Sequence, residues 1–70
     1  MKQMSGKELA KLLEDHGWQL RRINGSHHIY SKTGSIVRLS VPIHGNKPLG
    51  EGLLKHLLKM AEIPARELES

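Results

Sequence analysis

Two leucine-rich segments with helical spacing flank a middle segment whose apolar residues alternate. Apolar side chains recur three and four positions apart in residues 9–16 and again in residues 53–61, the pattern of helices with one buried face. Residues 18–41 consist of short runs with β-branched residues, separated by glycine-containing turns. The chain therefore predicts two helices packed on one face of a small antiparallel sheet.

Both helices have recognisable ends. Residues 5–8 form a capping box, in which a serine hydroxyl and a glutamate carboxylate satisfy free N–H groups at the start of a helix. Gly17 suits the left-handed conformation that ends many helices, so the first helix is expected over residues 5–16. The second helix is expected over residues 53–61, and a proline after it favours a short final helix over residues 65–68.

Three strands are expected between the helices. An Asn-Gly pair at positions 24 and 25 predicts a hairpin turn between strands over residues 18–23 and 27–32. A third strand is expected over residues 36–41, and Pro42 favours its end because proline cannot donate to the ladder. The sequence therefore predicts one α+β domain, residues 1–70, in the order helix, three-stranded antiparallel sheet, helix. One sheet face would be covered by helices and the other left open to an extended ligand.

Alternation along the strands assigns side chains to faces. Arg21 and Arg22 are expected on opposite faces of the first strand. His27 shares a face of the second strand with Ile29, which is expected in the core, while His28 points to the other face. His27 would escape burial because it lies beside a turn, where alternation often fails.

The positive charge of the chain is concentrated in its middle. The formal net charge is +4, yet residues 19–50 contain no Asp or Glu. Such a segment attracts phosphate backbones, although a surface facing water or an acidic protein is an alternative. The same lack of carboxylates argues against a Mg²⁺ site there. The basic residues of this segment are Arg21, Arg22, Lys32, Arg38 and Lys47.

Several classes of protein are disfavoured. The chain has no Cys, so neither a disulfide framework nor a thiolate metal site is expected. No apolar run approaches the roughly 20 residues of a membrane span, and the N-terminus has no apolar segment typical of a signal peptide. The adjacent histidines at positions 27 and 28 project to opposite strand faces, which is unsuitable for one metal ion. A cytoplasmic protein without a metal or other cofactor is expected.

Two sequence motifs resemble those of a known family. The chain is similar to the HicA toxins of toxin–antitoxin systems in the strings GSHHIY at residues 25–30 and VPIHGNKPL at residues 41–49. The resemblance extends over nearly the whole chain, from about residue 5 to residue 63.

The resemblance implies a fold like that of a double-stranded-RNA-binding domain. It also implies a metal-independent endoribonuclease that cleaves mRNA and thereby arrests growth. The implied partner is a HicB-like antitoxin that neutralises the toxin. The toxin alone is expected to be a monomer, and the antitoxin complex to be of higher order. A non-catalytic RNA-binding module with the same fold is the alternative.

The family's catalytic histidine follows Gly-Ser, which places it at His27. An imidazole can act as base or acid near neutral pH, because its ordinary pKa is about 6.5. His28 stays open as an alternative catalyst, and a histidine that opens a strand can also simply bond to backbone. Ser26 could orient His27 or serve the turn. His44 could be the complementary acid or could brace its loop.

The remaining candidates would contact RNA. Gly25 could let a phosphate approach the backbone closely, although it also serves the turn. Tyr30 could stack on a base or pack in the core. Lys47 precedes the second helix, whose first N–H groups would favour an anion. The candidate RNA contacts are Arg21, Arg22, Gly25, Tyr30, Arg38 and Lys47.

Overall fold

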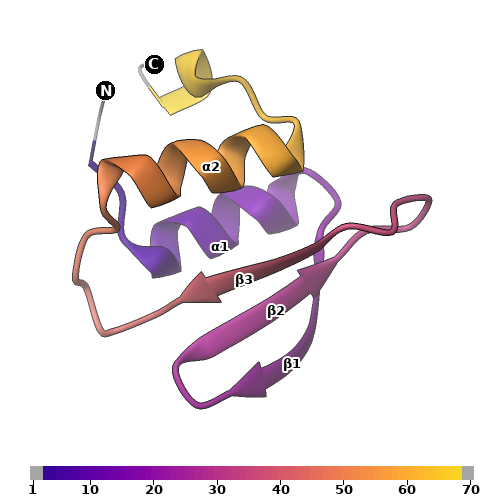
Figure 1. Cartoon of the computed structure of the whole chain (residues 1–70), viewed down its shortest axis with the longest axis horizontal. Helices are drawn as coiled ribbons and strands as arrows, with labels where there is room; N and C mark the ends of the chain where they lie inside the picture. The colour runs from indigo at the N-terminus through magenta and orange to yellow at the C-terminus, as the bar shows by residue number, and fades with distance from the viewer. Residues whose placement is uncertain (1–2, 69–70) are drawn as a thin grey trace.

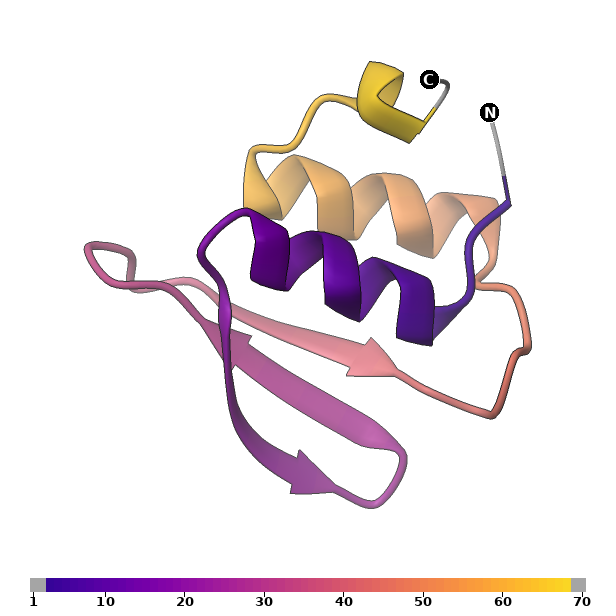
Figure 2. The same cartoon turned by 180° about the vertical axis from the view of Figure 1, so that it is seen from behind.

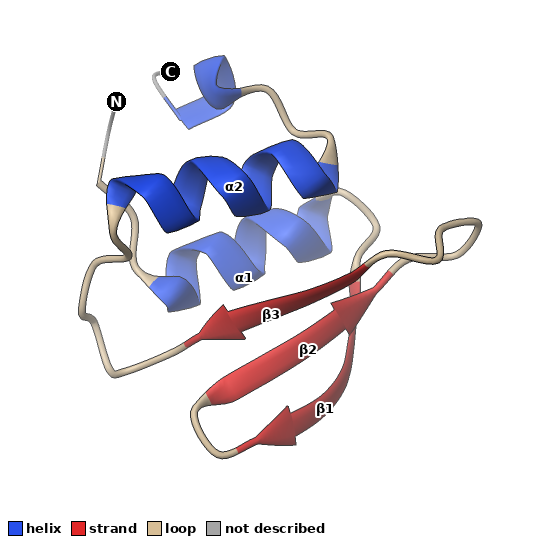
Figure 3. Cartoon of the chain, in the orientation of Figure 1, coloured by secondary structure: helices blue, strands red, loops and turns tan. Residues whose placement is uncertain are grey.

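The structure is a computed structural model that describes residues 3–68. The predicted α+β order is confirmed (Figure 3), including the short final helix, which is of the 3-10 type. The elements are α1 (Gly6–Asp15), β1 (Gln19–Asn24), β2 (His27–Ser31), β3 (Arg38–Pro42), α2 (Glu51–Ala61) and the 3-10 helix η1 (Ala65–Leu68).

The predicted ends of α1 are confirmed in detail. The Ser5 hydroxyl accepts a hydrogen bond from the N–H of Glu8 at 3.1 Å, and the Glu8 carboxylate accepts one from the N–H of Ser5 at 2.9 Å. At the other end, Gly17 has a φ of 90°. The N–H of Trp18 reaches back to the carbonyl of Leu13 at 2.9 Å, which completes a Schellman motif. Local signals thus fix where the chain leaves α1 and enters the sheet.

The sheet is an antiparallel meander in the order β1-β2-β3. The hairpin between β1 and β2 has Asn24 opposite His27, so its two loop residues are Gly25 and Ser26. The turn therefore lies one residue later than the Asn-Gly pair predicts. Gly25 has a φ of 62°, as the first loop residue of a type II′ turn requires.

The two main helices lie side by side over one face of the sheet, nearest β3 (Figure 1), and the opposite view agrees (Figure 2). Leucines from both helices meet the inward side chains of β3 in a single core, while the other face of the sheet is open. β1 forms the edge away from the helices, and all six of its residues are exposed. The fully buried side chains of the core are Leu9, Leu13, Leu39, Val41, Leu54 and Leu58.

Further details differ from the sequence prediction. The third strand begins at Arg38 rather than at residue 36, and Ile36 is 97% exposed in the preceding loop. The second helix begins two residues early, at Glu51. Ile29 is not in the core: it lies half-buried on the open face, while the Tyr30 side chain takes the core position.

Candidate functional site

The open face of the sheet is organised by alternate residues of its central strand, β2. His27, Ile29 and Ser31 follow one another along this face, because side chains two residues apart point to the same side. In the register of the sheet, Ser40 of β3 lies opposite Ile29, and Arg38 lies opposite Ser31. The face therefore carries an imidazole at one end and guanidinium groups further along.

His27 is exposed at the start of β2. Its Nδ1 lies 3.2 Å from the Oγ of Ser40, which is its diagonal neighbour on β3. This contact orients the ring and leaves Nε2 without a hydrogen-bonding partner among residues 3–68. Such a nitrogen is available to accept or donate a proton.

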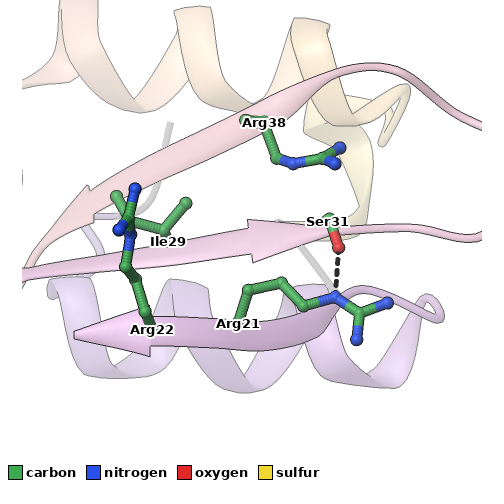
Figure 4. A pocket seen from close by; sticks show the side chains of 5 residues that line it. All are labelled: Arg21, Arg22, Ile29, Ser31 and Arg38. Carbon is green, nitrogen blue, oxygen red and sulfur yellow. Dashed lines mark hydrogen bonds between the residues drawn. The ribbon is translucent and has the colours of Figure 1, made fainter.

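A β-bulge between Leu20 and Arg22 places both neighbouring arginines on the open face. The prediction that Arg21 and Arg22 face opposite sides is therefore wrong, because the bulge breaks the alternation. Together with Arg38 they surround a hollow of about 420 Å³ (Figure 4). The hollow is lined by Arg21, Arg22, Ile29, Ser31 and Arg38.

Two sequence candidates lie on the helix-covered face instead. Tyr30 is 2% exposed and packs in the core, so the prediction that it stacks on a base is corrected. Burial raises the pKa of its phenol, and the negative charge of Glu14 raises it further. His28 is half-buried between Ile23 and Val41, on the face opposite His27.

The remaining candidates gather at the end of the sheet where His27 lies. Ser26, in the turn with Gly25, accepts a hydrogen bond through its carbonyl from the N–H of Ile43 at 2.8 Å. This bond holds the start of the loop after β3 against the turn. His44 and Lys47 are both exposed in that loop, and the N–H of Lys47 donates to the carbonyl of His44 at 3.0 Å.

Sequence reasoning missed two serines on the open face. Ser40 contacts His27, and Ser31 accepts a hydrogen bond from Arg21. Both contacts depend on which residues of neighbouring strands face each other. The hairpin turn could have suggested the register of β1 and β2, but the six residues between β2 and β3 leave the second register open.

Within residues 3–68, no three His, Asp or Glu side chains come together as a group that could hold a metal ion. No helix in this part of the chain is both long and apolar enough to cross a membrane.

Comparison with known proteins adds one match. Residues 6–63 match the family described as the HicA toxin of bacterial toxin–antitoxin systems. The matched region includes both main helices and the whole sheet. No curated protein matches the chain.

Proposed function

The chain belongs to the HicA family of bacterial toxin–antitoxin toxins, and from this membership we propose that it is an endoribonuclease that cleaves mRNA with a histidine and without a metal ion. The observation that carries the proposal is the position of His27. Its ring is exposed on the same open face as three arginines, with one nitrogen held by Ser40 and the other free. An extended RNA strand on this face would meet both a proton-transfer group and positive charge.

Cleavage of RNA needs few groups from a protein. A ribose 2′-hydroxyl or a water molecule must lose a proton, the leaving 5′-oxygen must gain one, and the charge on the phosphorus oxygens must be stabilised. Nε2 of His27 would take the proton of the attacking hydroxyl, and His44, exposed in the loop after β3, would give a proton to the leaving 5′-oxygen. The guanidinium of Arg22, which is opposite Ile29 and so lies nearest His27 of the three arginines along the sheet, would stabilise the developing negative charge. The lack of Asp and Glu from residue 19 to residue 50 favours this route over one that needs a Mg²⁺ cage.

The other candidates have supporting roles in this proposal. His44 and Lys47 stand in the loop beside the turn and could contact the leaving strand, while Ser26 and Gly25 set the position of His27 through the turn. A HicB-like antitoxin would neutralise the toxin by denying RNA access to this basic face. The proposed site of action is the cytoplasm, where mRNA is the substrate.

Cleavage in the presence of a chelator tests the proposed function. Purified protein is incubated with an end-labelled single-stranded RNA and excess EDTA, and the products are separated on a denaturing gel. We expect discrete fragments whose yield is unchanged by EDTA. Cleavage that EDTA abolishes and Mg²⁺ restores would overturn the metal-free route, and binding without cleavage would leave only the RNA-binding module.

Ser40 is expected to position His27 rather than to react. Replacement of Ser40 by alanine removes one hydrogen bond to the imidazole. The net contribution of such a bond is about 1 kcal/mol, so kcat should fall roughly three- to tenfold. KM should stay within about twofold, because the exposed hydroxyl is not needed to hold RNA. Steady-state cleavage of one defined RNA measures both constants.

Threonine at position 40 is the matched control for this prediction. Ser40→Thr keeps the hydroxyl and suits a strand, so it should recover most of the lost kcat. If alanine and threonine reduce kcat equally, or if alanine raises KM alone, the hydroxyl does not position His27.

A further inference from the structure

Three of the five side chains that line the hollow on the open face are arginines. It lies between β1 and β3 and is crossed by β2, with Arg21 and Arg38 at one end and Arg22 beside Ile29 (Figure 4). Three guanidinium groups around one hollow repel one another unless an anion lies among them. All three charged side chains that line it are guanidinium groups, whose planar arrays of donors match the oxygens of a phosphate.

Arg21 is held in place by the sheet itself. Its Nε donates to the Oγ of Ser31 at 2.5 Å, and the backbone bulge directs the side chain over β2. Ser31 is only 4% exposed as a result, although it lies on the open face. With Nε engaged, the two terminal nitrogens of Arg21 remain as donors, and less side-chain entropy is lost when they bind a ligand.

No carboxylate in the described chain neutralises these arginines. The two ion pairs within residues 3–68 are His16 with Glu67 and Lys55 with Glu51, and neither involves the hollow. Among the described residues, the one hydrogen-bonding contact of the Arg38 side chain runs from Nη1 to the carbonyl of Val37 at 3.4 Å. The positive charge of the hollow is therefore available to a ligand.

The hollow and His27 lie along the same strand, β2. His27 and Ser31 are the first and last residues of β2, so at the usual rise of a strand they lie about 13 Å apart. A stacked nucleic-acid strand advances about 3.4 Å per nucleotide and an unstacked one advances further, so this distance corresponds to about two to four nucleotides.

We infer that the hollow is a phosphate-binding subsite for the same RNA strand that is cut at His27, at a phosphate about two to four nucleotides from the scissile one. The inference rests on the proposed function and adds the spacing along the RNA between the cleaved phosphate and a second bound phosphate. The subsite holds the strand along β2, so that the scissile phosphate reaches the imidazole. It would read no base, because the proposed contacts of its guanidinium groups are with phosphate oxygens.

A phosphate scan combined with arginine variants tests this inference. Short single-stranded RNAs with one mapped cleavage site each carry a single uncharged methylphosphonate, moved stepwise to either side of that site. Each RNA is cut by wild-type protein, by Arg38→Gln and by Arg21→Gln, and kcat/KM is measured in EDTA. Lys11→Gln removes the same charge from the exposed surface of α1 and is the matched control.

The expected result is a loss at one position that depends on the arginines. With wild-type protein, the methylphosphonate at the subsite should lower kcat/KM roughly tenfold, the loss expected for one charged hydrogen-bonded contact. Arg38→Gln should lower kcat/KM on the unmodified RNA by a similar factor, and the two losses should not multiply. For the Lys11→Gln control, each methylphosphonate should lower kcat/KM by the same factor as it does for wild-type protein.

Three results would overturn the inference. In the first, the losses of kcat/KM caused by Arg38→Gln and by the methylphosphonate multiply at every position. In the second, a methylphosphonate lowers kcat/KM only at the phosphates next to the cleavage site. Either would remove the subsite while leaving the ribonuclease in place. The third is absence of cleavage of unmodified RNA by wild-type protein, which would overturn the proposed function and the subsite together.

Discussion

Protein in which His27 is replaced by alanine is expected to bind RNA but to cleave it at least about 100-fold more slowly than wild type, the usual contribution of a positioned acid or base. The ring is exposed on the open face, so its loss should leave the core intact. RNA affinity should change little, because the arginines that would hold the backbone are retained. Cleavage in excess EDTA, a filter-binding assay and circular dichroism of the same samples measure the three quantities.

His28→Ala is the control, because His28 is the adjacent residue on the opposite face. It should cut RNA at close to the wild-type rate, provided that its thermal unfolding shows an intact fold. Equal cleavage by wild type and the His27 variant would remove His27 from the chemistry. Loss of cleavage in a folded His28 variant alone would move the catalytic role to His28. RNA binding without cleavage by any of the three proteins would favour the non-catalytic module.

The order of elements could be predicted because its signals are local. The capping box at Ser5 and the left-handed Gly17 act within a few residues of the helix ends that they fix. The leucine spacing of each helix follows the period of the helical turn, so it is also a local signal. Those parts of the fold need no knowledge of what packs against them.

The arrangement of the open face could not be predicted in the same way. The bulge at Arg21 shifts one strand by a residue, and no local pattern in the run Gln-Leu-Arg-Arg announces it. The contact of His27 with Ser40 depends on the pairing of strands across a long loop. The faces of the sheet were also ambiguous, since Ile29 and Tyr30 are both acceptable core residues and only the helices decide between them.

The start of α1 packs closely on the end of β3. An ideal Cβ built on Gly6 would lie 2.1 Å from the carbonyl oxygen of Pro42 and 3.0 Å from Cγ1 of Ile43. Two further contacts tie the same region together: a β-bridge joins Ser5 to Pro48, and the N–H of Leu49 donates to the carbonyl of Met4 at 2.8 Å. The nearest of these atoms belongs to the backbone of Pro42, so a rotamer change of a neighbour cannot make room for a side chain at Gly6.

Gly6→Ala is therefore expected to destabilise the protein by about 3 kcal/mol, the upper part of the range for overpacked sites. For a domain of this size, that loss lowers Tm by about 12–24 °C. The new methyl group forces α1 away from Pro42, which pairs with His27 in the sheet, so the folded fraction that remains should also cut RNA more slowly. Thermal unfolding followed by the fluorescence of Trp18, the single tryptophan and 4% exposed, measures the stability change.

Gly52→Ala separates this packing effect from helix propensity. Gly52 also lies in the first turn of a helix, but a Cβ there meets no atom within 4 Å. Helix propensity alone predicts that alanine stabilises both positions, by up to about 1 kcal/mol. The structure predicts opposite signs, with Tm raised at position 52 and lowered at position 6. If Tm rises in both variants, α1 does not approach Pro42 as closely as the structure places it, and the support that this contact gives to the strand end beside His27 is lost with it.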